Sequence, residues 1–228
     1  MGHITIQSDT TLQPITLIGK EAGICYGADT TNQEKNYKRG LDCLKSQHGR
    51  TLEFPTVYMV LDGYSARVIR EFYTHIGGAP TRLQASTRYI EYGEFEYITP
   101  PSIKKVESAD KLYDGLMALI STSIKKLEEA GIPKEDTANL LPLGMATKVV
   151  CKINLRTLIE MSHQRMCNRA YWEFRELFRD IRRELKDYSP EWSYLVDTYF
   201  EPKCFYLGRC PEKFSCGRFT TPPTTPAN

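Results

Sequence analysis

Two clusters that contain arginine hold most of the side chains that could do chemistry. The first covers residues 154–175 (NLRTLIEMSHQRMCNRAYWEFR), with four arginines, one histidine and two asparagines around short apolar stretches. On an ideal helix Arg156, Glu160 and His163 share one face, whereas Arg165 lies roughly opposite, at the end of the expected helix. The residues alone favour a structural role, in which Arg156 pairs with Glu160 and Arg165 interacts with the helix dipole.

The second cluster covers residues 74–89 (THIGGAPTRLQASTRY). Its two glycines and proline predict a tight connection, and behind it gather the polar side chains Arg82, Gln84, Ser86, Thr87 and Arg88. Hydroxyls, backbone N–H groups and a forked guanidinium are the donors that a phosphate requires. A helix stop followed by an edge strand with a solvated polar face explains the same residues, so both interpretations stay open.

A third group is the run Cys204-x5-Cys210-x5-Cys216. Three thiols could hold zinc with a fourth ligand from elsewhere, for which Cys167 is a candidate. The spacing lacks the paired C-x-x-C of a zinc ribbon, so we expect free structural thiols and no metal, with a zinc site as the alternative. The sequence also has no G-x-G-x-x-G, G-x-x-x-x-G-K-[ST], H-E-x-x-H or G-x-S-x-G, so any nucleotide is held by another arrangement.

The hydrophobic periodicity indicates the elements that position these residues. It predicts strands over 55–61, 86–98 and 146–153, and helices over 33–47, 66–76, 108–131, 155–165 and after Asn168. Asp62, Asn154 and Asn168 are the expected helix caps. Helices outnumber strands without regular alternation, so the prediction is an α+β fold with a central mixed or antiparallel sheet packed by long helices. We expect one domain over residues 1–218 and a flexible tail over 219–228 (FTTPPTTPAN).

Composition limits the classes of function. Thirty Lys and Arg against 28 Asp and Glu leave a net charge of +2, which argues against a nucleic-acid binder that works by bulk electrostatics. The chain has no apolar run near the roughly 20 residues that span a bilayer, and no basic and apolar leader follows Met1. We therefore expect a cytoplasmic protein with reduced thiols and with no membrane or nucleic-acid partner.

Three stretches together resemble the flavin-dependent thymidylate synthase family. Residues 141–177 (LPLGMATKVVCKINLRTLIEMSHQRMCNRAYWEFREL) resemble the block in which L-P-L leads to a strand, N-x-R and R-x-x-x-R-A-x-W-E. Ile24-Cys-Tyr-Gly with residues 47–54 (QHGRTLEF) resembles the early H-x-[ST]-x-x-E-H stretch, and residues 83–89 (LQASTRY) resemble the end of the S-x-R-Y signature. The resemblance covers about residues 20–218.

The resemblance implies an FAD-dependent methyltransferase that makes dTMP from dUMP, with a methylene group from methylenetetrahydrofolate and a hydride from reduced FAD, recharged by NADPH. It implies Arg165 as the catalytic residue that polarises the uracil. The dUMP residues would be Gln84, Ser86, Thr87, Arg88 and Arg165. The FAD residues would be His48, His75, Arg82, Asn154, Arg156 and Arg169. The family also implies a homotetramer with active sites at subunit interfaces.

The sequence departs from the family pattern at several positions. The usual R-H-R reads Thr74-His75-Ile76, the arginine before L-P-L is missing at 137–139, and the early E-H pair reads Glu53-Phe54. Arg82 is the expected compensating cation. These departures leave three alternatives behind dUMP methylation: a flavin enzyme for another pyrimidine nucleotide, a flavoprotein that only oxidises NADPH, and a zinc-stabilised nucleic-acid-binding module.

Overall fold

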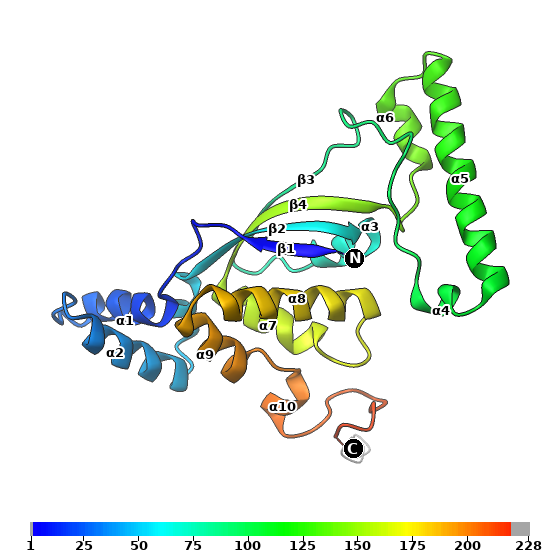
Figure 1. Ribbon diagram of the computed structural model, residues 1–228. Helices are drawn as coiled ribbons and strands as arrows, with labels where there is room; N and C mark the ends of the chain where they lie inside the picture. The colour runs from blue at the N-terminus through cyan, green and yellow to red at the C-terminus, as the bar shows by residue number, and fades with distance from the viewer. Residues whose placement is uncertain (1, 220–228) are drawn as a thin grey trace, which may run out of the picture. The chain divides into compact units, whose positions relative to one another are not determined.

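A four-stranded antiparallel sheet in the order β1-β2-β4-β3 is the centre of the fold (Figure 1). The structure is a computed structural model, and it describes residues 2–219. The strands are β1 (His3–Ile6), β2 (Thr56–Ser65), β3 (Thr81–Gln84) and β4 (Ala146–Asn154). Two hydrogen bonds set the register of β2 against β4: Leu155 N–H donates to the Pro55 carbonyl (2.9 Å) and Ala66 N–H to the Met145 carbonyl (2.8 Å). Alternate residues of β4 are buried, as expected for a strand with one covered face.

Helices make up most of the remaining structure. The long ones are α1 (Pro14–Cys25), α2 (Gln33–Lys45), α5 (Glu107–Glu129), α7 (Leu155–Arg165), α8 (Trp172–Tyr188) and α9 (Pro190–Tyr199). The short ones are α3 (Ala66–Phe72), α4 (Pro101–Lys104), α6 (Lys134–Thr137) and α10 (Lys203–Leu207), with 3-10 turns η1 (Gly49–Glu53) and η2 (Ala138–Leu140). The predicted α+β class is therefore confirmed. No helix of residues 2–219 is long and apolar enough to cross a membrane.

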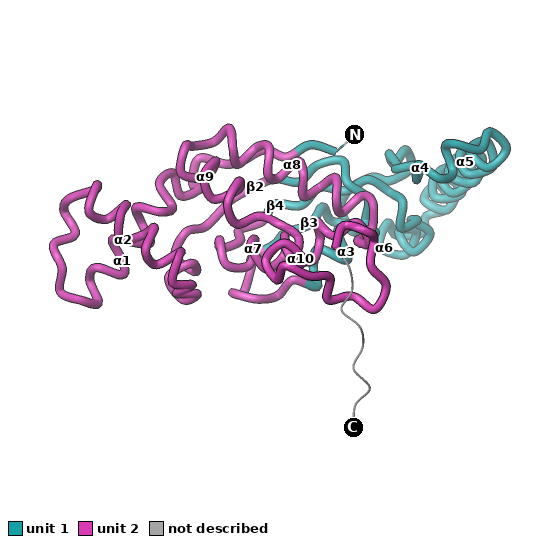
Figure 2. Tube along the Cα trace, turned by 90° about the horizontal axis from the view of Figure 1, so that it is seen from below, with its two compact units in different colours: residues 1–3, 60–74, 82–150 teal, residues 4–59, 75–81, 151–228 magenta. Residues whose placement is uncertain are grey.

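The chain forms two compact units (Figure 2). Unit 1 comprises residues 1–3, 60–74 and 82–150 and includes α3 to α6; unit 2 comprises residues 4–59, 75–81 and 151–228 and includes α1, α2 and α7 to α10. Strands β2 and β4 each pass from one unit to the other. The single domain over 1–218 stays a prediction, and nine residues of the predicted tail, 220–228, lie outside the described part of the chain.

Unit 2 has its core along α8. Phe174, Leu177, Phe178, Ile181 and Leu185 are fully buried, so the amphipathic stripe predicted for this helix is correct. The stripe of α5 in unit 1 behaves differently. Ile124 is buried, but Leu112, Leu116 and Leu119 expose 65%, 47% and 62% of their surface. The helix is thus correctly predicted, whereas three leucines of its apolar stripe stay exposed within residues 2–219.

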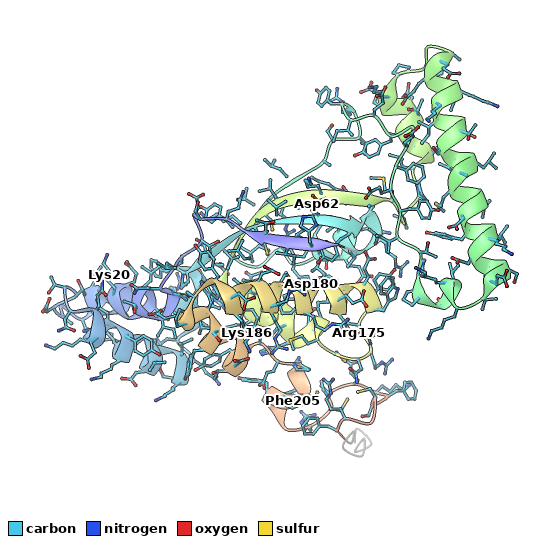
Figure 3. The ribbon with its side chains drawn as sticks, in the orientation of Figure 1. Lys20, Asp62, Arg175, Asp180, Lys186 and Phe205 are labelled. Atoms are coloured by element: carbon cyan, nitrogen blue, oxygen red, sulfur yellow. The ribbon has the colours of Figure 1, made fainter. Side chains whose placement is uncertain are left out.

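Local predictions are wrong in three stretches of the chain. Asp62 does not cap α3, because β2 continues to Ser65, whose Oγ accepts the Val68 N–H (3.2 Å); the Asp62 carboxylate instead pairs with Lys148 Nζ at 2.6 Å (Figure 3). The same helix ends at Phe72 rather than at Ile76.

Asn168 does not cap α8, which starts at Trp172 with no side-chain cap. The Asn168 carbonyl accepts a hydrogen bond from Arg175 Nη1. The Asn168 side-chain amide donates to Cys216 Sγ and accepts from Arg218 Nη2, both of which follow α10. The third error concerns residues 86–98, where a strand was expected. The strand is β3, just before them, and Tyr97 alone pairs with Met145 in an isolated antiparallel bridge.

Candidate active site

The junction of β4 and α7 carries the first predicted site residue, Asn154. Its Oδ1 accepts the Thr157 N–H at 2.9 Å, and the side chain is buried. The predicted cap is therefore confirmed. Because Asn154 ends the strand and begins the helix, it fixes where α7 starts and hence the positions of the arginines that follow.

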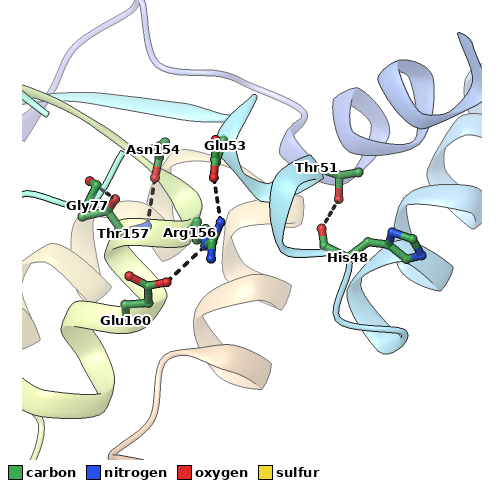
Figure 4. A network of polar contacts seen from close by, with 8 residues as sticks. All are labelled: His48, Thr51, Glu53, Gly77, Asn154, Arg156, Thr157 and Glu160. Atoms are coloured by element: carbon green, nitrogen blue, oxygen red, sulfur yellow. Dashed lines mark hydrogen bonds and ion pairs between the residues drawn. The ribbon is translucent and has the colours of Figure 1, made fainter. Parts of the chain in front are cut away.

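The Gly77-Gly78 turn packs directly against this helix start. Gly78 has a φ of +68°, and a Cβ atom there would lie 2.2 Å from the Asn154 amide nitrogen. Thr157 Oγ1 donates a hydrogen bond to the Gly77 carbonyl at 2.5 Å (Figure 4). Glycine at 78 thus lets the turn approach the start of the helix, and His75, three residues before Gly78, contacts Arg165 at the end of the same helix.

Arg165 at the end of α7 contacts His75 and Phe174, both of unit 2. Its Nε donates to His75 Nε2 at 2.9 Å, and its guanidinium carbon lies 4.5 Å from the centroid of the Phe174 ring. The imidazole itself packs edge-on against Phe174, with the ring centroids 5.8 Å apart at 71°. The imidazole is buried, and its Nε2 acts as the acceptor of this bond. A hydrogen bond and a cation–π contact therefore fix one cation in a half-buried place.

Arg156 has a different environment. Its Nη1 pairs with Glu53 at 2.7 Å and its Nε with Glu160 at 3.1 Å, and these two carboxylates raise its pKa (Figure 4). The predicted Arg156–Glu160 pair is therefore confirmed, with Glu53 as a second partner. His48 is exposed, and its imidazole points away from this network. Its carbonyl accepts from the Thr51 N–H (3.0 Å) and Oγ1 (2.7 Å), which stabilises the η1 turn.

Unit 2 also contains a cavity of about 510 Å³, which we name the Arg165 cavity. Its walls are His163, Gln164, Arg165, Cys167, Asn168, Arg169, Ala170, Pro202, Lys203, Cys204, Cys210, Pro211, Glu212, Cys216 and Arg218. His163 stacks on the Tyr206 ring, with centroids 5.3 Å apart, and burial lowers its pKa below the usual 6.5. Arg165 and Arg169 are the predicted site residues that open onto this cavity.

The four cysteines of the zinc alternative all line this cavity. They are free thiols, of which Cys204 and Cys210 are buried and Cys216 is exposed. The Asn168 amide donates a weak hydrogen bond to Cys216 Sγ at 3.7 Å. Within residues 2–219, however, no three His, Cys, Asp or Glu side chains are close enough to hold a metal ion. The arrangement thus gives the zinc alternative no support.

Four of the five predicted dUMP residues lie in unit 1, where Gln84 ends β3 and Ser86, Thr87 and Arg88 follow it, whereas Arg165 belongs to unit 2. The Ser86 Oγ accepts the Arg88 N–H at 3.1 Å, which folds the loop back on itself, and Arg88 Nε pairs with Glu135 Oε2 at 3.0 Å. The Gln84 amide donates to Thr147 Oγ1 at 3.3 Å. Gln84, Thr87 and Arg88 are exposed, and Ser86 is half-buried.

Arg82 is held by aromatic side chains. Its guanidinium carbon lies 5.2 Å and 5.1 Å from the ring centroids of Phe72 and Tyr73, and its Nη1 donates to the Tyr73 carbonyl at 3.0 Å. Arg82 therefore has a structural function beside α3. Its compensating role toward a cofactor stays a prediction.

The structure thus groups the predicted residues into two sets. The residues of unit 2 are His48, His75, Asn154, Arg156, Arg165 and Arg169, and those of unit 1 are Arg82, Gln84, Ser86, Thr87 and Arg88. Two partners were not predicted as site residues. Phe174 was recognised only as an apolar position of α8, and Glu53 only as a departure from the E-H pair. Glu53 matches the glutamate of the H-x-[ST]-x-x-E-H stretch that residues 47–54 resemble, and this match is the signal in the sequence that points to it.

Comparison with known proteins identifies the family. Residues 8–191 match the family described as "Thymidylate synthase complementing protein". Flavin-dependent thymidylate synthases of Pyrococcus horikoshii (33% identity, 73% of this chain and 69% of that protein) and Clostridium tetani (27%, 91% and 90%) are similar in sequence. The fold resembles a Helicobacter pylori flavin-dependent thymidylate synthase complexed with FAD and dUMP, with a TM-score of 0.68 and 19% identity over 87% of this chain and all of that one.

The chain therefore belongs to the thymidylate synthase complementing protein family, the family of the flavin-dependent thymidylate synthases. The resemblance inferred from the three sequence stretches is confirmed.

Proposed function

We propose that this chain is a flavin-dependent thymidylate synthase that methylates dUMP at C5 of the uracil to form dTMP. A methylene group from methylenetetrahydrofolate and a hydride then make up the methyl group. The observation that carries the proposal is the fixed guanidinium of Arg165, held by His75 and Phe174 at the wall of a cavity. Membership of the family supports the choice of substrate.

Arg165 supplies the polarisation that the reaction needs. C5 can attack the methylene carbon when the uracil has lost its N3 proton to solvent, because the ring is then an anion with negative charge on its carbonyl oxygens and C5 is electron-rich. A cation fixed in a poorly hydrated site stabilises that charge by a few kcal/mol, and it needs no reorganisation at the moment of reaction. His75 contributes by keeping the guanidinium in one orientation, so we assign it a positioning role.

The donor set of unit 2 fits FAD in part. Arg169 contacts the carbonyl and the ring of Phe214, both neutral, so its charge can serve a phosphate. His48 is exposed and can donate a hydrogen bond, and Asn154 has an amide beside the Gly78 turn. Arg156 fits less well, because two carboxylates already pair with it. When bound, FAD supplies the hydride after reduction by NADPH, the chemistry that no side chain of this protein can perform.

Ser86, Thr87 and Arg88 of unit 1 would hold the dUMP phosphate. Ser86 and Thr87 offer hydroxyls, and Arg88 offers a fork of N–H donors. Gln84 would lie beside the nucleoside. Arg88 pairs with Glu135 in the single chain, so a phosphate must displace that carboxylate to use both guanidinium nitrogens. We therefore expect the Glu135 carboxylate to lower the affinity for dUMP by competing with its phosphate for Arg88.

We further propose that the enzyme works as a homotetramer in the cytoplasm. The exposed leucines of α5 support an oligomer. Leu112, Leu116 and Leu119 share one side of the helix, and burial against a second copy would remove their apolar surface from water. Leu119→Asp on this face should dissociate the assembly in analytical ultracentrifugation, whereas Lys111→Asp, elsewhere on α5, should leave it intact. A tetramer that survives Leu119→Asp would exclude this face as the contact.

Two measurements test the proposed function. The first is the absorption spectrum of the protein with FAD, followed after anaerobic NADPH with and without dUMP. Flavin bands that bleach faster with dUMP are expected. Flavin that binds but ignores dUMP would favour an enzyme for another pyrimidine nucleotide, and no flavin binding would refute the proposal.

The second measurement is dTMP formation by Arg165→Ala. We expect turnover to fall by orders of magnitude while folding and FAD affinity change little. Arg179→Ala is the matched control, because Arg179 is an exposed arginine of α8 that pairs with Glu176. Unchanged turnover in Arg165→Ala would remove this residue from the mechanism.

A further inference from the structure

The Arg165 cavity has a second wall that the family match does not reach. Residues 203–218 supply seven of its lining side chains, including Lys203, Glu212 and Arg218. The family match ends at residue 191, so membership of the family assigns no role to this segment. The segment thus places new polar groups beside the proposed catalytic arginine.

Arg218 is held in place by neutral partners. Its Nη2 donates to Asn168 Oδ1 at 2.9 Å, and its guanidinium carbon lies 5.5 Å from the centroid of the Phe205 ring on α10. An amide oxygen and an aromatic ring position a guanidinium without neutralising it. These contacts therefore leave the positive charge of Arg218 available to a ligand of the cavity.

The wall of the cavity has an excess of positive charge. Among the described residues four cationic side chains line it, Arg165, Arg169, Lys203 and Arg218, against the single carboxylate of Glu212. A concave surface with one sign of charge and low-dielectric walls concentrates ions of the opposite sign. A volume of about 510 Å³ also admits more than a single small ion. The arrangement is therefore suited to an anionic group that carries more than one charge.

We propose that residues 203–218 complete an anion-binding site in which Arg218 and Lys203 bind a doubly charged group of a co-substrate, either a diphosphate or a pair of carboxylates. Guanidinium groups bind both kinds of anion through paired hydrogen bonds. The identity of the ligand rests on the proposed function, under which NADPH carries a diphosphate and the folate carries carboxylates. The binding of an anion by the cavity does not depend on it.

Calorimetric titration of the full chain with inorganic pyrophosphate tests the site. We expect Arg218→Ala to weaken binding about tenfold or more, the loss of one charge-assisted contact. Arg209→Ala is the matched control, since Arg209 is an exposed arginine of the same segment that does not line the cavity. Its affinity should stay within about twofold of the unmutated chain. Lys203→Ala replaces Arg218→Ala as the test if the latter lowers the unfolding temperature.

The Michaelis constants of NADPH and methylenetetrahydrofolate in dTMP formation show whether the cavity binds a diphosphate or a pair of carboxylates. A rise for NADPH alone in Arg218→Ala identifies the diphosphate, and a rise for methylenetetrahydrofolate alone identifies the carboxylates. A rise for dUMP alone would overturn the assignment to a co-substrate. Equal pyrophosphate affinity in Arg218→Ala and the unmutated chain, or an equal loss in Arg209→Ala, would overturn the site. A chain that binds pyrophosphate through Arg218 but makes no dTMP would instead refute only the proposed function.

Discussion

Replacing His75 by leucine tests whether the orientation of Arg165 matters. The change removes the acceptor of the 2.9 Å bond from Arg165 Nε and keeps an apolar side chain against Phe174. A hydrogen bond to a charged group contributes about 1.5–3 kcal/mol. If this bond acts in the transition state, kcat/KM for dUMP falls about 10- to 150-fold, since about 1.4 kcal/mol corresponds to a factor of ten.

Steady-state dTMP formation measures the effect, with two controls. His75→Gln keeps an acceptor oxygen and should recover most of the lost kcat/KM. In an Arg165→Ala background, His75→Leu should have almost no further effect, because residues that act through each other are not additive. FAD affinity and unfolding temperature are measured for each variant, since His75 is also a proposed FAD residue and is buried.

Two results would refute this reasoning. Unchanged kcat/KM in a folded His75→Leu protein would mean that the guanidinium is positioned without the imidazole. Equal losses with and without Arg165 would mean that His75 acts on the flavin or on the fold rather than on Arg165.

Three further predictions concern the nucleotide, the helix cap and pH. Arg88→Ala should raise the KM for dUMP more than it lowers kcat at saturation, and a larger effect on kcat than on KM would exclude Arg88 as a phosphate ligand. Glu135→Gln should lower the KM for dUMP by up to about fivefold, because an exposed ion pair is worth at most about 1 kcal/mol. Asn154→Ala should cost about 1 kcal/mol of unfolding free energy, a fall of ~2–4 °C in Tm, whereas Asn154→Ser, which keeps an acceptor, should lose less than half of that. Equal losses would contradict the capping role. Burial lowers the pKa of His163 below 6.5, so the unfolded chain binds more protons below that pH, and stability falls as the pH drops from 6.5 through the folded pKa. Denaturant unfolding between about pH 5 and pH 7 should show this loss and show it reduced in His163→Gln; identical slopes would refute it.

Local signals explain the part of the fold that the sequence predicted well. Asn154 follows a short β-rich run and precedes an apolar stripe of helical period, so cap, strand end and helix start all agree. Residues 33–47 are similar, since Asn32 caps α2 and its stop lies within two residues of the expected one. Both signals lie within a few residues of the feature they specify.

The wrong caps have the same origin as the correct one. Asp62 and Asn168 are residue types that cap helices. Ser65 is as good a cap for α3 as Asp62, and only the length of β2 decides between Asp62 and Ser65. That length depends on pairing with β4, more than 80 residues away. The bond between Arg165 and His75 joins residues 90 positions apart, and no local pattern encodes it. The chemistry of the site therefore depends on contacts that a single sequence does not reveal.

The apolar stripe of α5 shows a further limit of periodicity. The spacing of Leu112, Leu116, Leu119 and Ile124 predicts that one face avoids water, and it is silent about what covers that face. In this chain Ile124 is buried, while the three leucines remain exposed. Exposed leucines three and four positions apart are costly in water, whereas isolated surface leucines are ordinary. The same spacing therefore fits both a buried core helix and a helix with exposed leucines, and the exposed fractions of the side chains distinguish the two where the sequence does not.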